Sequence, residues 1–280
     1  MTSEVRPFRF GVSLLATGSR AQFQDKARQA EELGYDVIQV PDHLGMSAPF
    51  PTMVSAADAT SLRVGTYVLN TAFYRPALLA RDVADTMRLT DGRLELGLGT
   101  GYVEAEFTAA GLPFESGGRR VDNVAQTVRE LRHLLADQQQ PMPPLLLAGT
   151  GNRMLTLAAQ EADIVGFPLP AGITPGLEPE KALAARIALV RDAAGDRDPE
   201  LNLFIAAVAV TPAKPDLSLF LQIMPGATEE LLLSLPSILV GSPHQIAERL
   251  HHFRETHGIS YFGVLEDAMA AFAEVIPLLR

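Results

Sequence analysis

The chain has 280 residues, 47% of them hydrophobic, and a formal net charge of −10. The acidic excess disfavours a nucleic-acid or anionic-membrane binder, because both partners are negatively charged. The sequence contains no cysteine, which excludes disulfides, thiolate metal sites and a cysteine nucleophile. It shows no apolar run of about 18 residues, and residues 1–7 lack the apolar segment of a secretory signal. We therefore expect a cytoplasmic protein.

Short apolar strands alternate with amphipathic helices along the chain. The first strand spans 8–15, where apolar and other residues alternate, and the first helix spans 19–33, ending at Gly34. In chain order, the next ranges are strands 37–41 and 62–70, helix 76–89, strand 93–99, helix 119–135, strand 144–148, helix 152–161, strand 164–167, helix 178–193, strand 201–210, helix 243–256, strand 259–264 and helix 268–279. Segments 44–57, 102–118 and 211–236 are expected to be loops.

Eight strands, each followed by a helix, favour a closed parallel barrel over an open doubly wound sheet. A Rossmann-type sheet would show G-x-G-x-x-G after its first strand, where this chain reads Leu15-Ala16-Thr17-Gly18-Ser19. No repeat and no low-complexity linker divides the chain. The sequence thus predicts an α/β protein, a single-domain (β/α)8 TIM barrel over residues 1–280 with loop insertions at its C-terminal face.

The expected second strand is followed by Asp42 and His43. In a parallel barrel, residues just past the carboxyl ends of strands face the active site. A carboxylate beside an imidazole can orient a ligand and exchange a proton near neutral pH. The alternative is a loop aspartate that caps a helix next to a solvent-facing histidine, and the sequence leaves both interpretations open.

Two glycine-rich turns follow the expected fourth and fifth strands. They read Gly99-Thr100-Gly101-Tyr102 and Gly149-Thr150-Gly151-Asn152-Arg153-Met154. Glycine lets a ligand approach the backbone and its free amides, which suits a phosphate or a flat ring. Either turn alone is more simply a tight strand-to-helix connection, but two on adjacent strands favour a ligand platform.

Other segments give weaker signals. The third strand ends with Tyr67, Val68, Leu69 and Asn70, which could lie beneath a ring, although core packing of Val68 and Leu69 is the simpler interpretation. The histidines at positions 251, 252 and 257 are expected on a solvated helix face. We expect no metal site.

Several motifs, in a shared order along most of the chain, make it resemble the luciferase-like flavin/deazaflavin oxidoreductases, most closely the branch that uses coenzyme F420. They comprise the Asp42-His43 pair, both glycine turns, Ala27-x-x-Ala30-Glu31-Glu32-Leu33-Gly34-Tyr35-Asp36, Arg75-Pro76-Ala77-Leu78-Leu79-Ala80-Arg81, Gly92-Arg93-Leu94-Glu95-Leu96-Gly97-Leu98, Ala162-Asp163-Ile164-Val165 and Gly258-Ile259-Ser260-Tyr261-Phe262.

The resemblance implies a barrel enzyme, commonly a homodimer, that binds F420 or, alternatively, FMN together with a small-molecule substrate. His43 would lie near the reactive carbon of the deazaflavin, as proton donor or oriented hydrogen bond, with Tyr102 as a second donor and Asp42 at the cofactor edge. It also implies a non-proline cis peptide near Tyr67-Val68. Arg153 and the turns would hold the ribityl chain and phosphate, and Arg75 is a candidate for the acidic tail.

This sequence departs from the family pattern in three places. Sugar-phosphate dehydrogenases of the F420 branch carry a glutamate where this chain has Tyr102, so that substrate is doubtful. Bacterial luciferase carries a phosphate-binding arginine where this chain has Thr100, which weakens an FMN monooxygenase. The linker that precedes the fifth strand in the family is cut short here, at residues 138–143, which would leave one wall of the pocket open. We expect hydride transfer between F420 and a carbonyl or activated alkene; an FMN-dependent monooxygenase and a non-catalytic cofactor-binding barrel are the alternatives.

Overall fold

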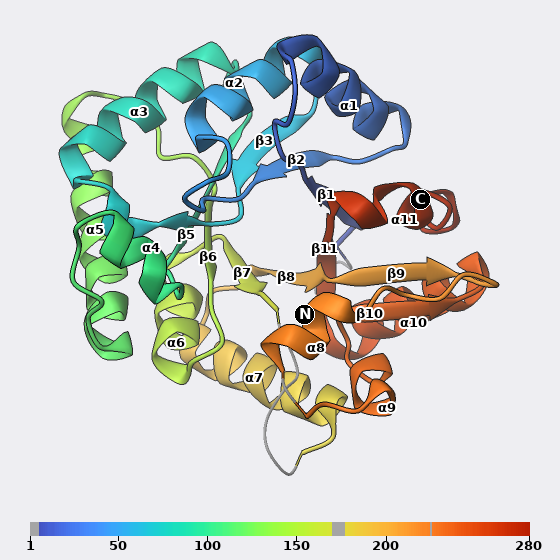
Figure 1. Ribbon diagram of the computed structural model, residues 1–280. Helices are drawn as coiled ribbons and strands as arrows, with labels where there is room; N and C mark the ends of the chain where they lie inside the picture. The colour runs from blue at the N-terminus through green and yellow to red at the C-terminus, as the bar shows by residue number, and fades with distance from the viewer. Residues whose placement is uncertain (1–5, 170–176, 225) are drawn as a thin grey trace.

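The protein folds as a closed, eight-stranded parallel (β/α)8 barrel in the computed structural model, which describes residues 6–169, 177–224 and 226–280 (Figure 1). Around the barrel the order is β3-β2-β1-β11-β8-β7-β6-β5-β4, and a further pairing of β3 with β5 closes it. The strands are β1 (Arg9–Ser13), β2 (Val37–Val40), β3 (Arg63–Thr66), β4 (Leu69–Asn70), β5 (Leu94–Gly99), β6 (Leu145–Ala148), β7 (Ile164–Phe167), β8 (Glu200–Ile205) and β11 (Ile259–Leu265). The predicted fold class is confirmed.

β3 and β4 together occupy one of the eight barrel positions. The expected single strand 62–70 is interrupted at the Tyr67–Val68 peptide, which is cis, as the resemblance implied. On the far side of the interruption, Leu69 pairs with Leu98 and Asn70 with Gly99. The carboxyl end of this position is therefore fixed against the first glycine turn.

Helices surround the barrel and bury one apolar face each against the strands (Figure 1). They are α1 (Arg20–Glu32), α2 (Pro49–Ala59), α3 (Pro76–Leu89), α5 (Gly117–Asp137), α6 (Asn152–Glu161), α7 (Pro179–Ala194), α10 (Pro243–His257) and α11 (Met269–Ala273). The strands are nearly continuous apolar runs because both of their faces are covered. Among the described helices, none is long and apolar enough to cross a membrane.

Three segments expected to be loops contain regular structure, so these predictions were wrong in part. Within or across the expected loops lie α2, α4 (Glu104–Ala109), α8 (Ser218–Ile223) and α9 (Glu229–Leu233). α2 starts at Pro49, in the first helical turn where proline fits, and buries Met53 and Ala56. The helix is rich in small residues, so its sequence shows only a weak helical periodicity. Its stability comes from burial against the rest of the fold.

The expected strand 201–210 is two strands. β8 stays in the barrel, whereas β9 (Ala207–Val210) leaves it and pairs in parallel with β10 (Ile238–Gly241), which the sequence did not predict. Figure 1 shows this pair extending outward beside α10. The expected closing helix 268–279 is also broken: α11 is short, and Pro277 lies in a separate 3₁₀ turn because proline cannot continue a helix interior.

Candidate active site

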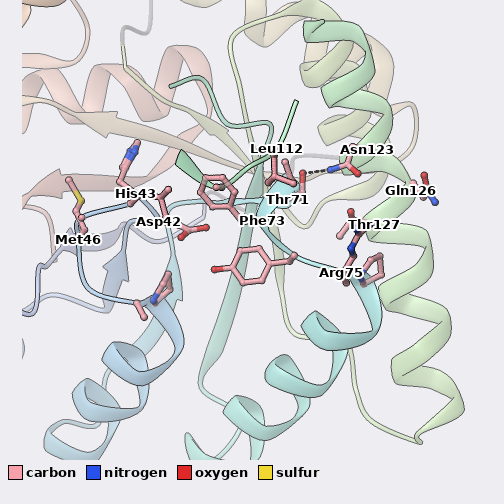
Figure 2. Close-up of a pocket in the computed structure, with 18 of the residues that line it drawn as sticks. Asp42, His43, Met46, Thr71, Phe73, Arg75, Leu112, Asn123, Gln126 and Thr127 are labelled. Atoms are coloured by element: carbon pink, nitrogen blue, oxygen red, sulfur yellow. Dashed lines mark hydrogen bonds between the residues drawn. The ribbon is translucent and has the colours of Figure 1, made fainter. Parts of the chain in front are cut away.

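A cavity of about 790 Å³ opens at the carboxyl ends of β2 and β4. One wall is the segment after β2, with Asp42, His43 and Met46; another is the segment that leads from β4 into α3. Figure 2 shows Asn123, Gln126 and Thr127 of α5 facing these segments across the cavity. The volume falls in the range of about 300–1,000 Å³ that small-molecule and cofactor sites occupy.

His43 is held by a carboxylate that the sequence analysis missed. Its Nδ1 lies 2.9 Å from Glu106 Oε1, and its Nε2 lies 3.5 Å from Tyr102 Oη. The Tyr102 ring meets the imidazole edge-on, with ring centroids 5.6 Å apart. Glu106 belongs to the short helix α4, in a segment expected to be a loop. No helical spacing signalled this contact, because Tyr102 precedes α4, which begins at Glu104.

Asp42 is oriented by two donors from the following barrel position. The backbone N–H of Asn70 donates to Asp42 Oδ2 at 3.0 Å, and the Tyr74 hydroxyl also hydrogen-bonds the carboxylate. Burial raises the pKa of Asp42 above its ordinary value, and these hydrogen bonds oppose the increase without cancelling it. Asp42 and His43 thus share one rim of the cavity, as the strand-end rule predicted, and the helix-capping alternative is not what the structure shows.

The first glycine turn packs directly on the end of β4. Gly101 has φ +65°, and a Cβ there would lie 2.4 Å from Asn70 Nδ2, so only glycine fits. Asn70 Oδ1 accepts from the Ala72 N–H at 3.2 Å, while its Nδ2 is buried without a hydrogen-bond partner among the described residues. Thr71 Oγ1 donates to the carbonyl of Gly99 at 3.1 Å. This corner therefore offers an unpaired donor beside a backbone that carries no side chain.

Tyr67, Val68 and Leu69 each pack against a different part of the barrel. The Tyr67 ring stacks on Phe204 with centroids 4.6 Å apart, and burial raises the pKa of its hydroxyl. Val68 packs against Gly99, where a Cβ would lie 2.5 Å from one of its methyl groups. Leu69 is fully buried in the barrel core. Its side chain therefore serves packing, and only its backbone is near the site.

The second glycine turn is not part of the same cavity wall. Gly149 packs on Met154, which is buried, whereas Thr150, Gly151, Asn152 and Arg153 are exposed. Arg153 Nη2 pairs with Asp122 Oδ1 at 2.7 Å. None of these residues lines the 790 Å³ cavity; Asn70 and residues 99–102 do not line it either, but Asn70 and Tyr102 contact its wall at Asp42 and His43. The structure thus brings Asp42, His43, Asn70 and the first turn together and leaves the second turn further around the rim.

The family model described as luciferase-like monooxygenase matches residues 5–230. The chain belongs to this family. Among curated relatives it is 26% identical to an F420-dependent glucose-6-phosphate dehydrogenase of Kribbella flavida, over 91% of this chain and 92% of that protein. It is 24% identical to a 5,10-methylenetetrahydromethanopterin reductase of Methanolobus tindarius, over 55% of this chain but only about half (52%) of that protein.

A solved F420-dependent secondary alcohol dehydrogenase, in complex with an F420-acetone adduct, shares the fold. Its TM-score is 0.75 at 17% sequence identity, with 98% of this chain and all (100%) of that chain covered. The described cavity lies at the carboxyl ends of the strands. The family resemblance drawn from the sequence is therefore confirmed, and the protein is an enzyme of the luciferase-like oxidoreductase and monooxygenase group.

Proposed function

We propose that this protein is an F420-dependent oxidoreductase that transfers a hydride between the deazaflavin and a small carbonyl or activated-alkene substrate. The observation that carries the proposal is His43, held between Glu106 and Tyr102 at the wall of the cavity. F420 as the cofactor is supported by the names of the Kribbella flavida dehydrogenase and of the structurally similar secondary alcohol dehydrogenase, both F420-dependent. We further propose one domain over residues 1–280 that works in the cytoplasm as a homodimer.

The carboxyl ends of β4 and β5 offer a hydrogen-bond donor for a ring cofactor. Glycine at 99 and 101 admits the side chains of Val68 and Asn70, which a Cβ there would meet at 2.5 and 2.4 Å, and Asn70 Nδ2 is a buried donor without a described partner. Asp42 would hydrogen-bond the ring edge, and Arg75, which lines the cavity, would face the acidic tail. When bound, F420 supplies or accepts the hydride, and the protein supplies orientation and a proton.

His43 is placed to transfer a proton at Nε2. Glu106 accepts a hydrogen bond from Nδ1–H, which fixes the orientation of the ring and leaves Nε2 for the proton that is transferred. When Nε2 also carries a proton, Nε2–H is free to donate to a substrate oxygen or carbon, with Tyr102 Oη as its neighbour. After donation the neutral ring keeps Nδ1–H and presents Nε2 as an acceptor. The same geometry thus serves reduction and the reverse reaction.

The central test removes the imidazole. His43→Ala should lower kcat with F420 by about 10²- to 10⁴-fold, the contribution of a positioned acid or base, while cofactor affinity changes little. His244→Ala, at the start of a distant helix, is the matched control. Since the chain has no tryptophan, cofactor affinity is measured from the polarisation of F420 fluorescence. Equal turnover in His43→Ala and wild type would refute the role; binding of F420 without turnover on enones and carbonyls would favour a non-catalytic barrel.

An FMN-dependent monooxygenase is the second candidate, favoured by the description of the family model. Titration with FMN and F420 in parallel separates the two proposals, because it compares the affinity of the protein for each cofactor. Oxygen consumption with reduced FMN is the activity measurement. Binding of FMN and not F420 would replace the leading proposal with this one.

A further inference from the structure

Two histidines and one glutamate meet outside the barrel, away from the cavity. His252 and His257 lie on α10, and Glu180 lies in the first turn of α7. One ligand atom of each lies within 4.8 Å of the others. The expectation of a solvated helix face is wrong for His257, which is buried with 7% exposure. The sequence could not show the cluster, because Glu180 is 72 and 77 positions from its two partners.

We infer that Glu180, His252 and His257 form a binding site for a divalent transition-metal ion of the zinc type. Both imidazoles direct Nε2 at the same oxygen, Glu180 Oε1, at 2.6 Å from His252 and 3.1 Å from His257. Two imidazole nitrogens and a carboxylate oxygen are a three-ligand set that zinc accepts together with a water. Oxygen-preferring Mg²⁺ and Ca²⁺ do not favour such a set.

The separations of the donor atoms suit a small ion. Metal–nitrogen bonds of about 2.0–2.1 Å in a tetrahedral site place ligand atoms roughly 3.3 Å apart. The two described contacts to Glu180 Oε1 are shorter than this, so the groups need to separate by less than about 1 Å to admit the ion. The histidine rings lie with centroids 5.9 Å apart and planes nearly perpendicular, at 82°, and the Nε2 atoms of both contact Glu180 Oε1.

Neighbouring groups hold the ligands in place and leave an access route. Thr256 Oγ1 lies 3.2 Å from His252 Nδ1, which suits Nδ1–H as donor and leaves the Nε2 lone pair for a metal. Arg191 donates to the His257 carbonyl at 2.9 Å and fixes the end of α10. The side chain of His252 is 51% exposed, so solvent reaches the cluster and a water can complete the coordination.

One neighbouring cation opposes a metal electrostatically. Arg249 interacts with the charge of Glu180, but its guanidinium is directed at the carbonyls of Leu235 and Ile238, each at 3.2 Å. Because its hydrogen bonds point away from the cluster, Arg249 does not occupy the metal position. The ion would join the start of α7 to the end of α10, and therefore stabilise the fold when bound.

The test uses the untagged full chain and Zn²⁺ alone. Titration against a chromophoric chelator should show one tight equivalent in wild type, and Zn²⁺ but not Mg²⁺ should raise Tm. His252→Ala and Glu180→Gln should each weaken binding by more than about 10-fold and abolish the rise in Tm. His133→Ala is the matched control. His133 is an exposed histidine whose Nε2 lies 3.4 Å from the carboxylate of Asp137, but among the described residues this pair has no third ligand for a metal.

The variants give readouts that do not depend on catalysis. His252 is half-exposed, so its replacement is the variant expected to fold normally, and Tm without metal checks this for both changes. The visible absorption of bound Co²⁺ reports a tetrahedral site and should be lost in His252→Ala. Zinc binding that is absent in wild type, or unchanged in both His252→Ala and Glu180→Gln, would overturn the proposal. Neither result bears on F420 turnover, so the proposed function is tested separately.

Discussion

At the scale of single residues, the orientation of His43 depends on a side chain 63 positions further along the chain. Glu106 touches no reacting atom in the proposed reaction; it acts through the imidazole, as a positioning residue. Glu106→Gln keeps the shape but replaces a carboxylate that accepts from His43 Nδ1–H by an amide, which weakens the hydrogen bond that orients the ring. We expect kcat to fall by about 10- to 100-fold, within the contribution of a positioned acid or base, with little change in cofactor affinity.

The control for this prediction lies on the same short helix. Glu104 is exposed, and Glu104→Gln removes an equal charge from α4 without touching His43. Steady-state kinetics and F420 fluorescence polarisation on both variants separate a loss of turnover from a loss of binding. Equal kcat values for the two variants would show that Glu106 does not act through His43.

Asp42 gives a prediction about stability and pH. Burial raises its pKa above the ordinary 3.8, so the folded state holds the Asp42 proton more tightly than the unfolded chain. This carboxyl therefore costs no stability below pH 3.8, and its destabilising effect grows as pH rises through the folded pKa. Asp42→Asn should raise Tm at pH 7, because its amide oxygen still accepts from Asn70 and Tyr74 without carrying charge.

The difference between Asp42→Asn and wild type should shrink as the pH is lowered towards 3.8. Thermal unfolding measured in steps of pH tests this. Asp25→Asn, at an exposed carboxylate in α1, is the control for general loss of negative charge. A Tm gain for Asp42→Asn that is largest at low pH would contradict the sign of this prediction.

At the scale of elements, local signals predicted some segments to the residue and missed others. The expected bounds of α3, α6 and β7 match the structure because Pro76, Gly151 and Pro168 mark ends of these elements locally. The break between β3 and β4, and the departure of β9 to pair with β10, depend on neighbouring strands. Such pairings join segments that are distant in the sequence, so the strand propensity of one segment does not predict them.

The same division holds for the site. Asp42 and His43 were predicted because a rule of barrel topology connects a strand end to the active-site rim. Glu106 was missed because its contact with His43 depends on α4, a helix of one and a half turns within an expected loop. Arg153 was expected at the phosphate by resemblance; in the structure it pairs with Asp122, outside the described cavity.

Strand β5 carries a prediction about packing between elements. A Cβ at Gly97 would lie 2.0 Å from the Thr66 carbonyl oxygen of β3, a backbone atom that cannot rotate away. Gly97→Ala should lower the free energy of unfolding by at least about 1–3 kcal/mol, the usual cost of overpacking a core. Chemical denaturation monitored by circular dichroism measures the change.

A second glycine serves as the matched control. At Gly117, in the first turn of α5, an added Cβ meets no atom within 4 Å. Gly117→Ala should be neutral or stabilising by about 0.4–1 kcal/mol, because alanine restricts the unfolded chain. Similar losses in both variants would show that the close approach of β5 to β3 is not what requires glycine at position 97.

At the scale of the whole molecule, the two ends of the barrel have different roles. At the amino ends of the strands, opposite the cavity, Glu95 of β5 is 4% exposed and pairs with Arg9 of β1 and with Arg63 of β3 at 2.7 Å. Arg9 also pairs with Glu200 of β8 and lies 4.5 Å from the ring centroid of Tyr261 in β11. This network joins strands from both halves of the closed sheet.

Burial alone would lower the pKa of the Arg9 guanidinium, but Glu95 and Glu200 outweigh that effect and hold it above its ordinary value. Arg9 therefore stays charged. Removal of Glu95 takes away the ion-pair partner of Arg63 and leaves Arg9 with Glu200 alone, in this network at the amino ends of the strands, the floor of the barrel. Glu95→Gln should destabilise the fold by about 1–3 kcal/mol, the cost of leaving a buried hydrogen-bonding group without its partner. The loss should appear in one cooperative transition, because the network spans the barrel.

The exposed pair of Asp85 and Arg88 within α3 is the control. Asp85→Asn should change the free energy of unfolding by no more than about 0.5 kcal/mol, since water screens that pair. Denaturation by urea measures both variants, and kcat per folded molecule should stay near the wild-type value in each, because the floor lies at the opposite end of the barrel from His43. A fall in kcat for folded Glu95→Gln would mean that the floor also shapes the site, so that stability and catalysis are coupled through the strands.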